Sequence, residues 1–165
     1  MENTIQKRGT LWQTLVVDAA LLTAACLIPA ASHLLALPLY MLNPMLALLL
    51  AGILMSRDWQ NVLAMSVLLP LVSFLMTGMP AAPKMLCMMA ELATVAAATS
   101  LLCRRWAALP SVLVAIVAGK AVYYLLKAAV IAPAVLVGTD WKLQLLSVLL
   151  WGGLFALLSN RKTKR

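Results

Sequence analysis

Apolar residues gather in six long segments that are separated by short polar turns. The segments cover about residues 11–31, 44–55, 60–76, 83–103, 110–131 and 141–158. Most of them approach the roughly 20 apolar residues that a helix needs to cross the hydrocarbon layer of a membrane. We therefore predict an all-α integral membrane protein, in which residues 1–165 form a single six-transmembrane-helix bundle.

The composition favours the same class of protein. Of the 165 residues, 64% are hydrophobic and 11% are charged, whereas soluble domains average about 45–50% apolar and 25% charged residues. The length leaves no room for a nucleotide-binding domain, and no GxxxxGK[ST] motif occurs. Because Ser-His-Asp order, paired carboxylates and HExxH-type motifs are also missing, we predict no enzyme activity and no intrinsic cofactor.

Basic residues mark alternate ends of the apolar segments. Few of them flank the odd-numbered turns, where Lys84, Lys127 and Lys142 lie. Most belong to the N-terminus, the second and fourth turns and the C-terminus: Lys7, Arg8, Arg57, Arg104, Arg105, Arg161, Lys162, Lys164 and Arg165. Cytoplasmic segments carry such an excess, so we predict that both termini are cytoplasmic. The net charge of +8 then indicates topology and anionic lipid, with no nucleic-acid partner.

One stretch combines a turn with an unusual helical face: TGMPAAPKMLCMMAEL, residues 77–92. Lys84, Cys87, Met88 and Glu91 follow the spacing i, i+3, i+4 and i+7, which places them on one side of a helix. Glu91 is roughly 10 Å along that helix, where a carboxylate is costly and usually functional. We interpret this face as one wall of a ligand pocket; the alternative is a structural ion pair between Glu91 and Lys120.

A second face of the same kind occurs in the fifth segment, within GKAVYYLLK. Lys120, Tyr123, Tyr124 and Lys127 repeat the spacing i, i+3, i+4 and i+7. If the two segments are neighbours, Tyr124 is expected at the depth of Glu91, with Lys120 and Lys127 one turn to either side. The alternatives are a Lys127 that extends to the interface and tyrosines that belong to an interfacial aromatic belt.

Three other features admit both a functional and a structural interpretation. Cys87 and Met88 are soft metal ligands, although packing is the commoner role of such residues. His33 lies in an apolar first loop and is better explained as a hydrogen-bonding residue than as a metal ligand. Ala20 and Ala24 form a small-xxx-small pair that admits a partner helix, while Asp18 is expected to pair with a loop arginine.

The chain resembles the substrate-binding S components of energy-coupling factor (ECF) transporters, which import vitamins and their precursors. The similarity includes the size, the six predicted spans and the cytoplasmic termini. It also includes LPLYMLNPMLALLLAG, which is similar to the first loop and second span of that family, and PLVSFLMTGMP followed by MMAEL. Ala20 and Ala24 match the AxxxA motif with which the first helix of the family docks on the coupling subunit.

The resemblance implies a multi-pass protein of a bacterial or archaeal cell (inner) membrane. Its ligand would lie near the outer face, and a membrane coupling subunit with two cytoplasmic ATPases would drive release inward. By position it nominates Tyr40, Asn43, Lys84, Cys87, Glu91, Tyr124, Lys127 and Trp141, beside which Met88 and Tyr123 line the same two faces.

Two points stay open on the sequence alone. Cys87 is similar to the cysteine with which cobalamin-specific members coordinate cobalt, so cobalamin is the first candidate among the vitamins. The rival to the whole assignment is a self-contained secondary carrier or channel for a small solute, in which Glu91 and Lys120 relay protons or ions. Such carriers usually contain internal repeats, and the two halves of this chain show no convincing one.

Overall fold

The part of the chain that the computed structural model describes is helical, and comprises residues 2–34, 43–55, 59–78, 80–130 and 141–163. Nothing in these residues is a β-strand. The helices are α1 (Glu2–Leu34), α2 (Pro44–Met55), α3 (Trp59–Thr77), α4 (Ala82–Leu102), α5 (Ala108–Val130) and α6 (Trp141–Thr163). Each predicted apolar segment therefore corresponds to one helix, which confirms the all-α class.

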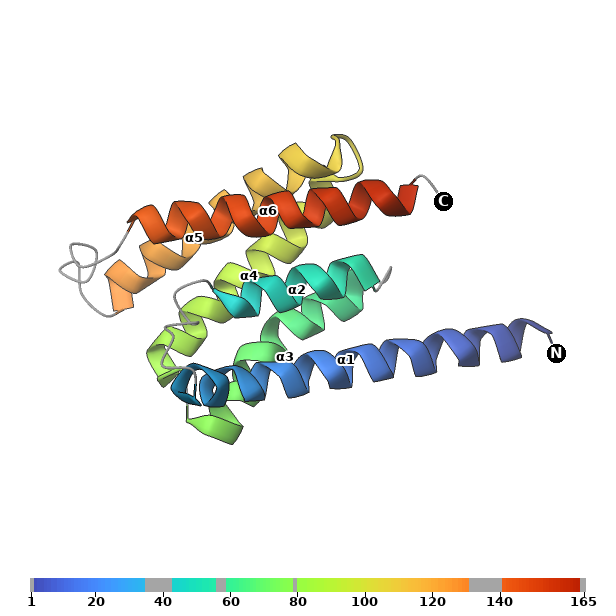
Figure 1. Cartoon of the computed structure of the whole chain (residues 1–165), viewed down its shortest axis with the longest axis horizontal. Coiled ribbons are helices and arrows are strands. Elements are labelled where there is room, and N and C mark those ends of the chain that lie inside the picture. The colour runs from blue at the N-terminus through green and yellow to red at the C-terminus, as the bar shows by residue number, and fades with distance from the viewer. Residues whose placement is uncertain (1, 35–42, 56–58, 79, 131–140, 164–165) are drawn as a thin grey trace.

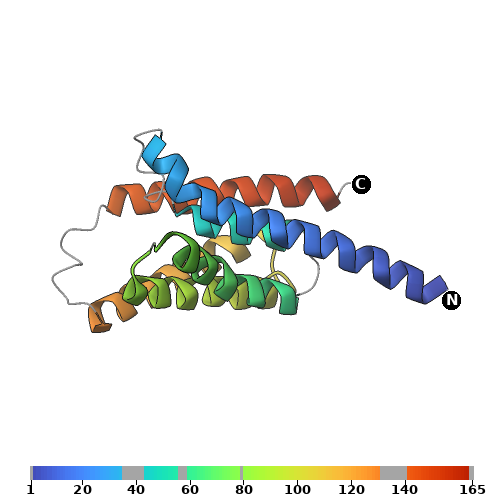
Figure 2. The ribbon, with the colours of Figure 1, turned by 90° about the horizontal axis from the view of Figure 1, so that it is seen from below.

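The helices form two layers of three (Figures 1 and 2). Helix α2 packs between α1 and α6 in one layer, and α4 packs between α3 and α5 in the other. Contacts of α1 and α2 with α3, and of α6 with α5, join the layers. The start of α1 and the end of α6 lie at the same end of the bundle (Figure 1); we call this the Cys103 end and the opposite one, where α4 begins, the Lys84 end.

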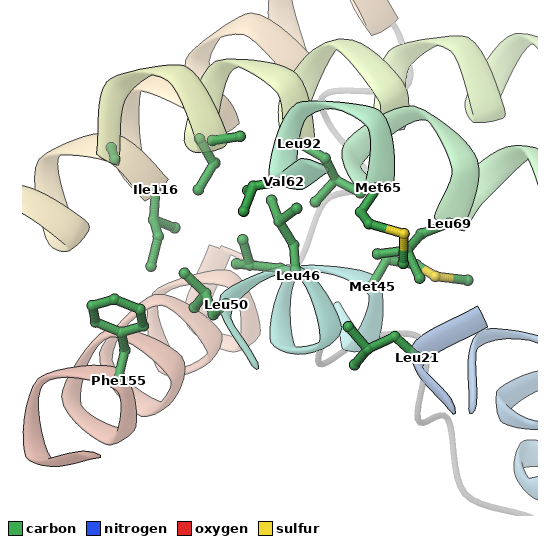
Figure 3. Close-up of a cluster of buried hydrophobic side chains, with 14 of the residues drawn as sticks. Leu21, Met45, Leu46, Leu50, Val62, Met65, Leu69, Leu92, Ile116 and Phe155 are labelled. Carbon is green, nitrogen blue, oxygen red and sulfur yellow. The ribbon is translucent and has the colours of Figure 1, made fainter. Parts of the chain in front are cut away.

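Side chains from all six helices meet in the apolar core that surrounds α2 (Figure 3). Leu46 of α2 is completely buried, as are Leu69 of α3 and Ile116 of α5. Large apolar side chains also cover the outside of the bundle, where Leu75 and Leu125 are 69% and 70% exposed. Helices that are apolar on both their inner and outer faces are expected in a bundle surrounded by lipid.

Among the described residues, four helices are long and apolar enough to cross a membrane: Trp12–Ser32 within α1, Trp59–Thr77, Ala82–Leu102 and Ala108–Val130. Helix α2 has 12 residues, which corresponds to about 18 Å against a hydrocarbon layer of about 30 Å. The apolar part of α6 is likewise short, at Gln144–Ser159. The six-span count and the cytoplasmic termini therefore stay predictions.

The boundaries of two helices show why the turns lie where they do. Helix α1 continues to Leu34, so Ser32 and His33, expected in the first loop, are helical. Helix α3 ends at Thr77, after which Gly78 adopts φ +69° and its N–H donates to the carbonyl of Phe74 at 2.8 Å. Glycine is favoured there because a side chain strains the left-handed backbone that terminates a helix.

Candidate functional site

Helices α4 and α5 run antiparallel and touch closely at Gly119. A Cβ atom placed on Gly119 would lie 2.5 Å from Cγ2 of Val95 and 3.0 Å from the carbonyl oxygen of Glu91. Such a short approach is possible only because glycine has no side chain. Gly119 therefore sets the register of the two helices and brings Glu91 level with Lys120.

This register corrects one prediction about the site. Glu91 was expected at the depth of Tyr124, but it lies beside Gly119 and Lys120. The difference is about one helical turn, or roughly 6 Å of rise. The cause is physical: residue spacing predicts which side chains share a face, whereas the close contact at Gly119 decides how far one helix slides along the other.

Glu91 is paired within the bundle. Its Oε1 atom lies 2.9 Å from Nζ of Lys120 and accepts a hydrogen bond of 2.9 Å from Nδ2 of Asn43. The Glu91 and Lys120 side chains are 2% and 12% exposed. The ion pair between Glu91 and Lys120, given above as the alternative to ligand contact, is present, and the carboxylate is occupied by partners from α5 and from the start of α2.

Asn43 connects the start of α2 to this ion pair. Its backbone adopts φ +51°, a left-handed conformation that asparagine tolerates better than most residues. The Asn43 carbonyl accepts the N–H of Leu46 at 3.0 Å, so the backbone begins α2 while the amide donates to Glu91. Pro44 follows at the first helical position, where its missing N–H has no cost.

Aromatic rings and ammonium groups follow toward the Lys84 end. Nζ of Lys120 lies 5.7 Å from the ring centroid of Tyr123, and Nζ of Lys127 lies 5.8 Å from the same centroid. Lys127 is also 5.9 Å from the Tyr124 ring, and the two tyrosines pack edge to face at 5.2 Å. These are cation–π distances, so Tyr123 links the two lysines of α5.

Lys84 of α4 belongs to the same group of charges. It is exposed in the first turn of α4, seven residues before Glu91, and Lys127 lies eight residues after Gly119 on α5. This agrees with the antiparallel register, which places the start of α4 beside the end of α5. The two polar faces therefore meet at Glu91 and Lys120, whereas the ligand pocket between them stays a prediction.

Cys87 and Met88 lie on the inner side of α4. Cys87 is 2% exposed and within electrostatic reach of Tyr123, and Met88 packs against the apolar core. Among the described residues, no three His, Cys, Asp or Glu side chains come close enough together to hold a metal ion.

Several predicted residues fall outside the described parts of the chain. Tyr40 lies within 35–42, and the side chains of His33 and Trp141 are likewise not described.

The predicted residues of α1 are described. Ala20 of α1 is exposed and Ala24 is half-buried. Asp18 accepts a hydrogen bond of 3.0 Å from Nδ2 of Asn61, so its described partner is an amide of α3, while Arg57 lies outside the described ranges.

Buried side-chain oxygens also occur in residues that the sequence did not single out, among them Thr99 and the half-buried Gln144. Oε1 of Gln144 and Oγ1 of Thr99 have no hydrogen-bond partner among the described residues. Gly152 of α6 lies against α5, since a Cβ placed on it would be 2.5 Å from Cδ2 of Leu113. Gln144 lies about two turns before Gly152 on α6, which places it near the level of Tyr123 on α5. Neither residue belongs to a periodic polar face, so no sequence pattern distinguished it.

No family model matches the chain, and the comparisons with curated proteins and with solved structures likewise gave no match.

Proposed function

We propose that the chain is the membrane-embedded, high-affinity substrate-binding subunit of an uptake system for a vitamin or a vitamin precursor. One observation carries the proposal: Glu91, Lys84, Lys120, Lys127 and two tyrosines converge at one end of an otherwise apolar bundle. Charged groups in membrane helices are costly and usually bind a solute, an ion or each other. The pair of Glu91 with Lys120 accounts for only two of the four charges.

The proposed ligand lies near the outer face, at the Lys84 end, and is released inward with an ATPase-driven coupling complex. The resemblance of the sequence to ECF S components supports this step, and it implies docking of the coupling subunit on α1 at Ala20 and Ala24. The exposure of Ala20 is compatible with such a contact. The proposed ligand-binding residues are Tyr40, Asn43, Lys84, Cys87, Met88, Glu91, Tyr123, Tyr124, Lys127 and Trp141.

The test uses the intact chain and two measurements. The chain is purified, denatured and searched by mass spectrometry for a co-purified small molecule; radiolabelled uptake of that molecule is then measured with and without a coupling ATPase complex. We expect a bound vitamin and uptake that depends on ATP. Uptake that needs a proton gradient but no ATPase would instead support a self-contained carrier, for which the Glu91–Lys120 pair is the obvious relay.

Cobalamin is the first ligand to test because of Cys87. If the thiolate coordinates cobalt, Cys87→Ala changes the visible absorbance spectrum of the bound corrin, whereas Cys103→Ala leaves it unchanged. Cys103 is a suitable control because it is exposed beyond the opposite end of α4. A spectrum that is the same in Cys87→Ala and in the parent chain would remove cobalt ligation from the proposal.

A further inference from the structure

Positive charge exceeds negative charge at the Lys84 end of the α4–α5 pair. Lys120 is neutralised by Glu91 at 2.9 Å. The contact of Gly119 with Glu91 places Lys84 of α4 and Lys127 of α5 at nearly the same level, and neither lysine has a carboxylate partner among the described residues. Asp140, the remaining acidic residue of the fifth loop, lies outside the described ranges.

The position of Lys84 at the start of α4 makes the local electrostatic potential still more positive. It lies in the first turn of α4, where no side chain caps the helix at Ala81 and no acidic residue is present. The N-terminal end of a helix carries partial positive charge from its free N–H groups. A lysine there is placed against the helix dipole, and a second lysine approaching from α5 adds like-charge repulsion.

Lys127 is held toward this cluster by aromatic contacts. Its Nζ lies within 6 Å of the ring centroids of both tyrosines, at 5.8 Å from Tyr123 and 5.9 Å from Tyr124. Tyr123 is itself only 8% exposed, so one of the two rings that the Lys127 ammonium contacts is buried in the bundle. Cation–π contacts attract the ammonium but leave its charge in place, so the cluster still lacks an anion.

We infer that Lys84 and Lys127 bind the carboxylate or phosphate group of a water-soluble ligand, while Glu91 holds Lys120 and Asn43 in position beside it. The inference rests on the proposed function, because it places the ligand of that uptake system at the Lys84 end. An anion between the two ammonium groups offsets their mutual repulsion and the unfavourable dipole at once. The two tyrosine rings provide an apolar, aromatic surface for the remainder of the same ligand.

The test measures anion binding without transport. The purified chain is placed in phosphatidylcholine nanodiscs, and its Tm is followed as acetate or inorganic phosphate replaces chloride at constant ionic strength. We expect a saturable rise in Tm that is reduced in Lys84→Gln and in Lys127→Gln. Arg105→Gln, which removes an exposed cation beyond the opposite end of α4, is the control and is expected to keep the full rise.

Three results would overturn the inference. One is an equal rise in Tm for the parent chain and for Lys84→Gln, a substitution at an exposed position that leaves the fold intact. Another is stabilisation that depends on these lysines but occurs only in nanodiscs containing phosphatidylglycerol, since the site would then bind a lipid headgroup. The third is a co-purified vitamin without an acidic group, which would leave the proposed uptake function standing. Conversely, anion binding that depends on these lysines, together with uptake that needs no ATPase, would refute the proposed ATPase-driven uptake but would leave the anion site standing.

Discussion

The two halves of the α4–α5 interface differ sharply, and they meet at Gly119. Toward the Cys103 end the contact is tight and apolar: Val95, Val112, Ala115 and Ile116 are all completely buried. Toward the Lys84 end the same two helices carry an ion pair, two aromatic rings and further lysines. One pair of helices thus contains both a tightly packed apolar contact and a charged, aromatic one.

The difference indicates which half determines the structure. A buried ion pair is weak evidence for stability, because the desolvation of two charges cancels much of their attraction. Close apolar packing has no such penalty, and any change of volume there is felt. We therefore expect the apolar half to set the register and the charged half to depend on it, and four substitutions test this from the largest effect to the smallest.

Glu91→Ala should have the largest effect, because it leaves Lys120 buried without its partner. Breaking a buried pair from one side typically costs about 3–5 kcal/mol, measured here as the free energy of unfolding in mixed micelles. The double variant Glu91→Leu with Lys120→Met should recover most of that loss, since no charge is then stranded. If the double variant were as unstable as Glu91→Ala, the ion pair itself would determine the helix packing.

Asn43→Gly isolates the hydrogen bond that joins α2 to the pair. Glycine keeps the backbone at φ +51° without strain, so the expected loss of about 1.5–3 kcal/mol is that of a hydrogen bond to a charged group. Asn43→Ala should lose about 1 kcal/mol more, because alanine resists the left-handed conformation. Equal unfolding free energies for the two variants would show that the backbone at this position is relaxed.

Gly119→Ala tests the junction of the two halves. The new Cβ meets Val95 and the carbonyl of Glu91 at 2.5 and 3.0 Å, and overpacking of this kind costs about 1–3 kcal/mol. Gly153→Ala in α6 is the matched control, since nothing lies within 4 Å of its Cβ and alanine is the better helix former. A neutral Gly119→Ala would contradict the close contact on which the register depends.

Thr99→Val should have the smallest effect and the opposite sign. Oγ1 of Thr99 is buried without a described partner in the apolar half, and an unsatisfied hydroxyl costs about 1–3 kcal/mol. Valine has nearly the same shape, so we expect a gain of about 1 kcal/mol in the free energy of unfolding. A loss of stability would show that the hydroxyl has a partner and that this half also contains a functional polar contact.

Much of the fold could be predicted because apolar runs and short polar turns leave few alternatives to helices. The pairing of Glu91 with Lys120 could also be anticipated, since a buried carboxylate needs a cation and the polar face of the next helix carries only Lys120 and Lys127. The sequence could not predict that Glu91 lies level with Lys120, one turn away from Tyr124. Periodicity shows which residues share a helical face but not how far one helix is shifted along its neighbour. Gly119 determines that translation through contacts with residues far away in sequence.

The role of Asn43 shows a second limit of the sequence. Its place before Pro44 predicts the start of a helix, and an asparagine there usually caps that helix with its side chain. In the structure the amide donates to Glu91, 48 positions later in the chain. Local propensity correctly predicted the turn but not the direction of the side chain, which tertiary contacts decide.

Cys87 of α4 and Cys103 at its C-cap can report how the chain is oriented in a membrane. Cys87 is buried near the Lys84 end and Cys103 is exposed at the other, about 24 Å apart by helical rise. A membrane-impermeant maleimide added to intact cells should therefore spare Cys103 if that end faces the cytoplasm, and should modify it in inverted vesicles. The native thiols allow the sidedness of the bundle to be measured without adding a tag or a new cysteine.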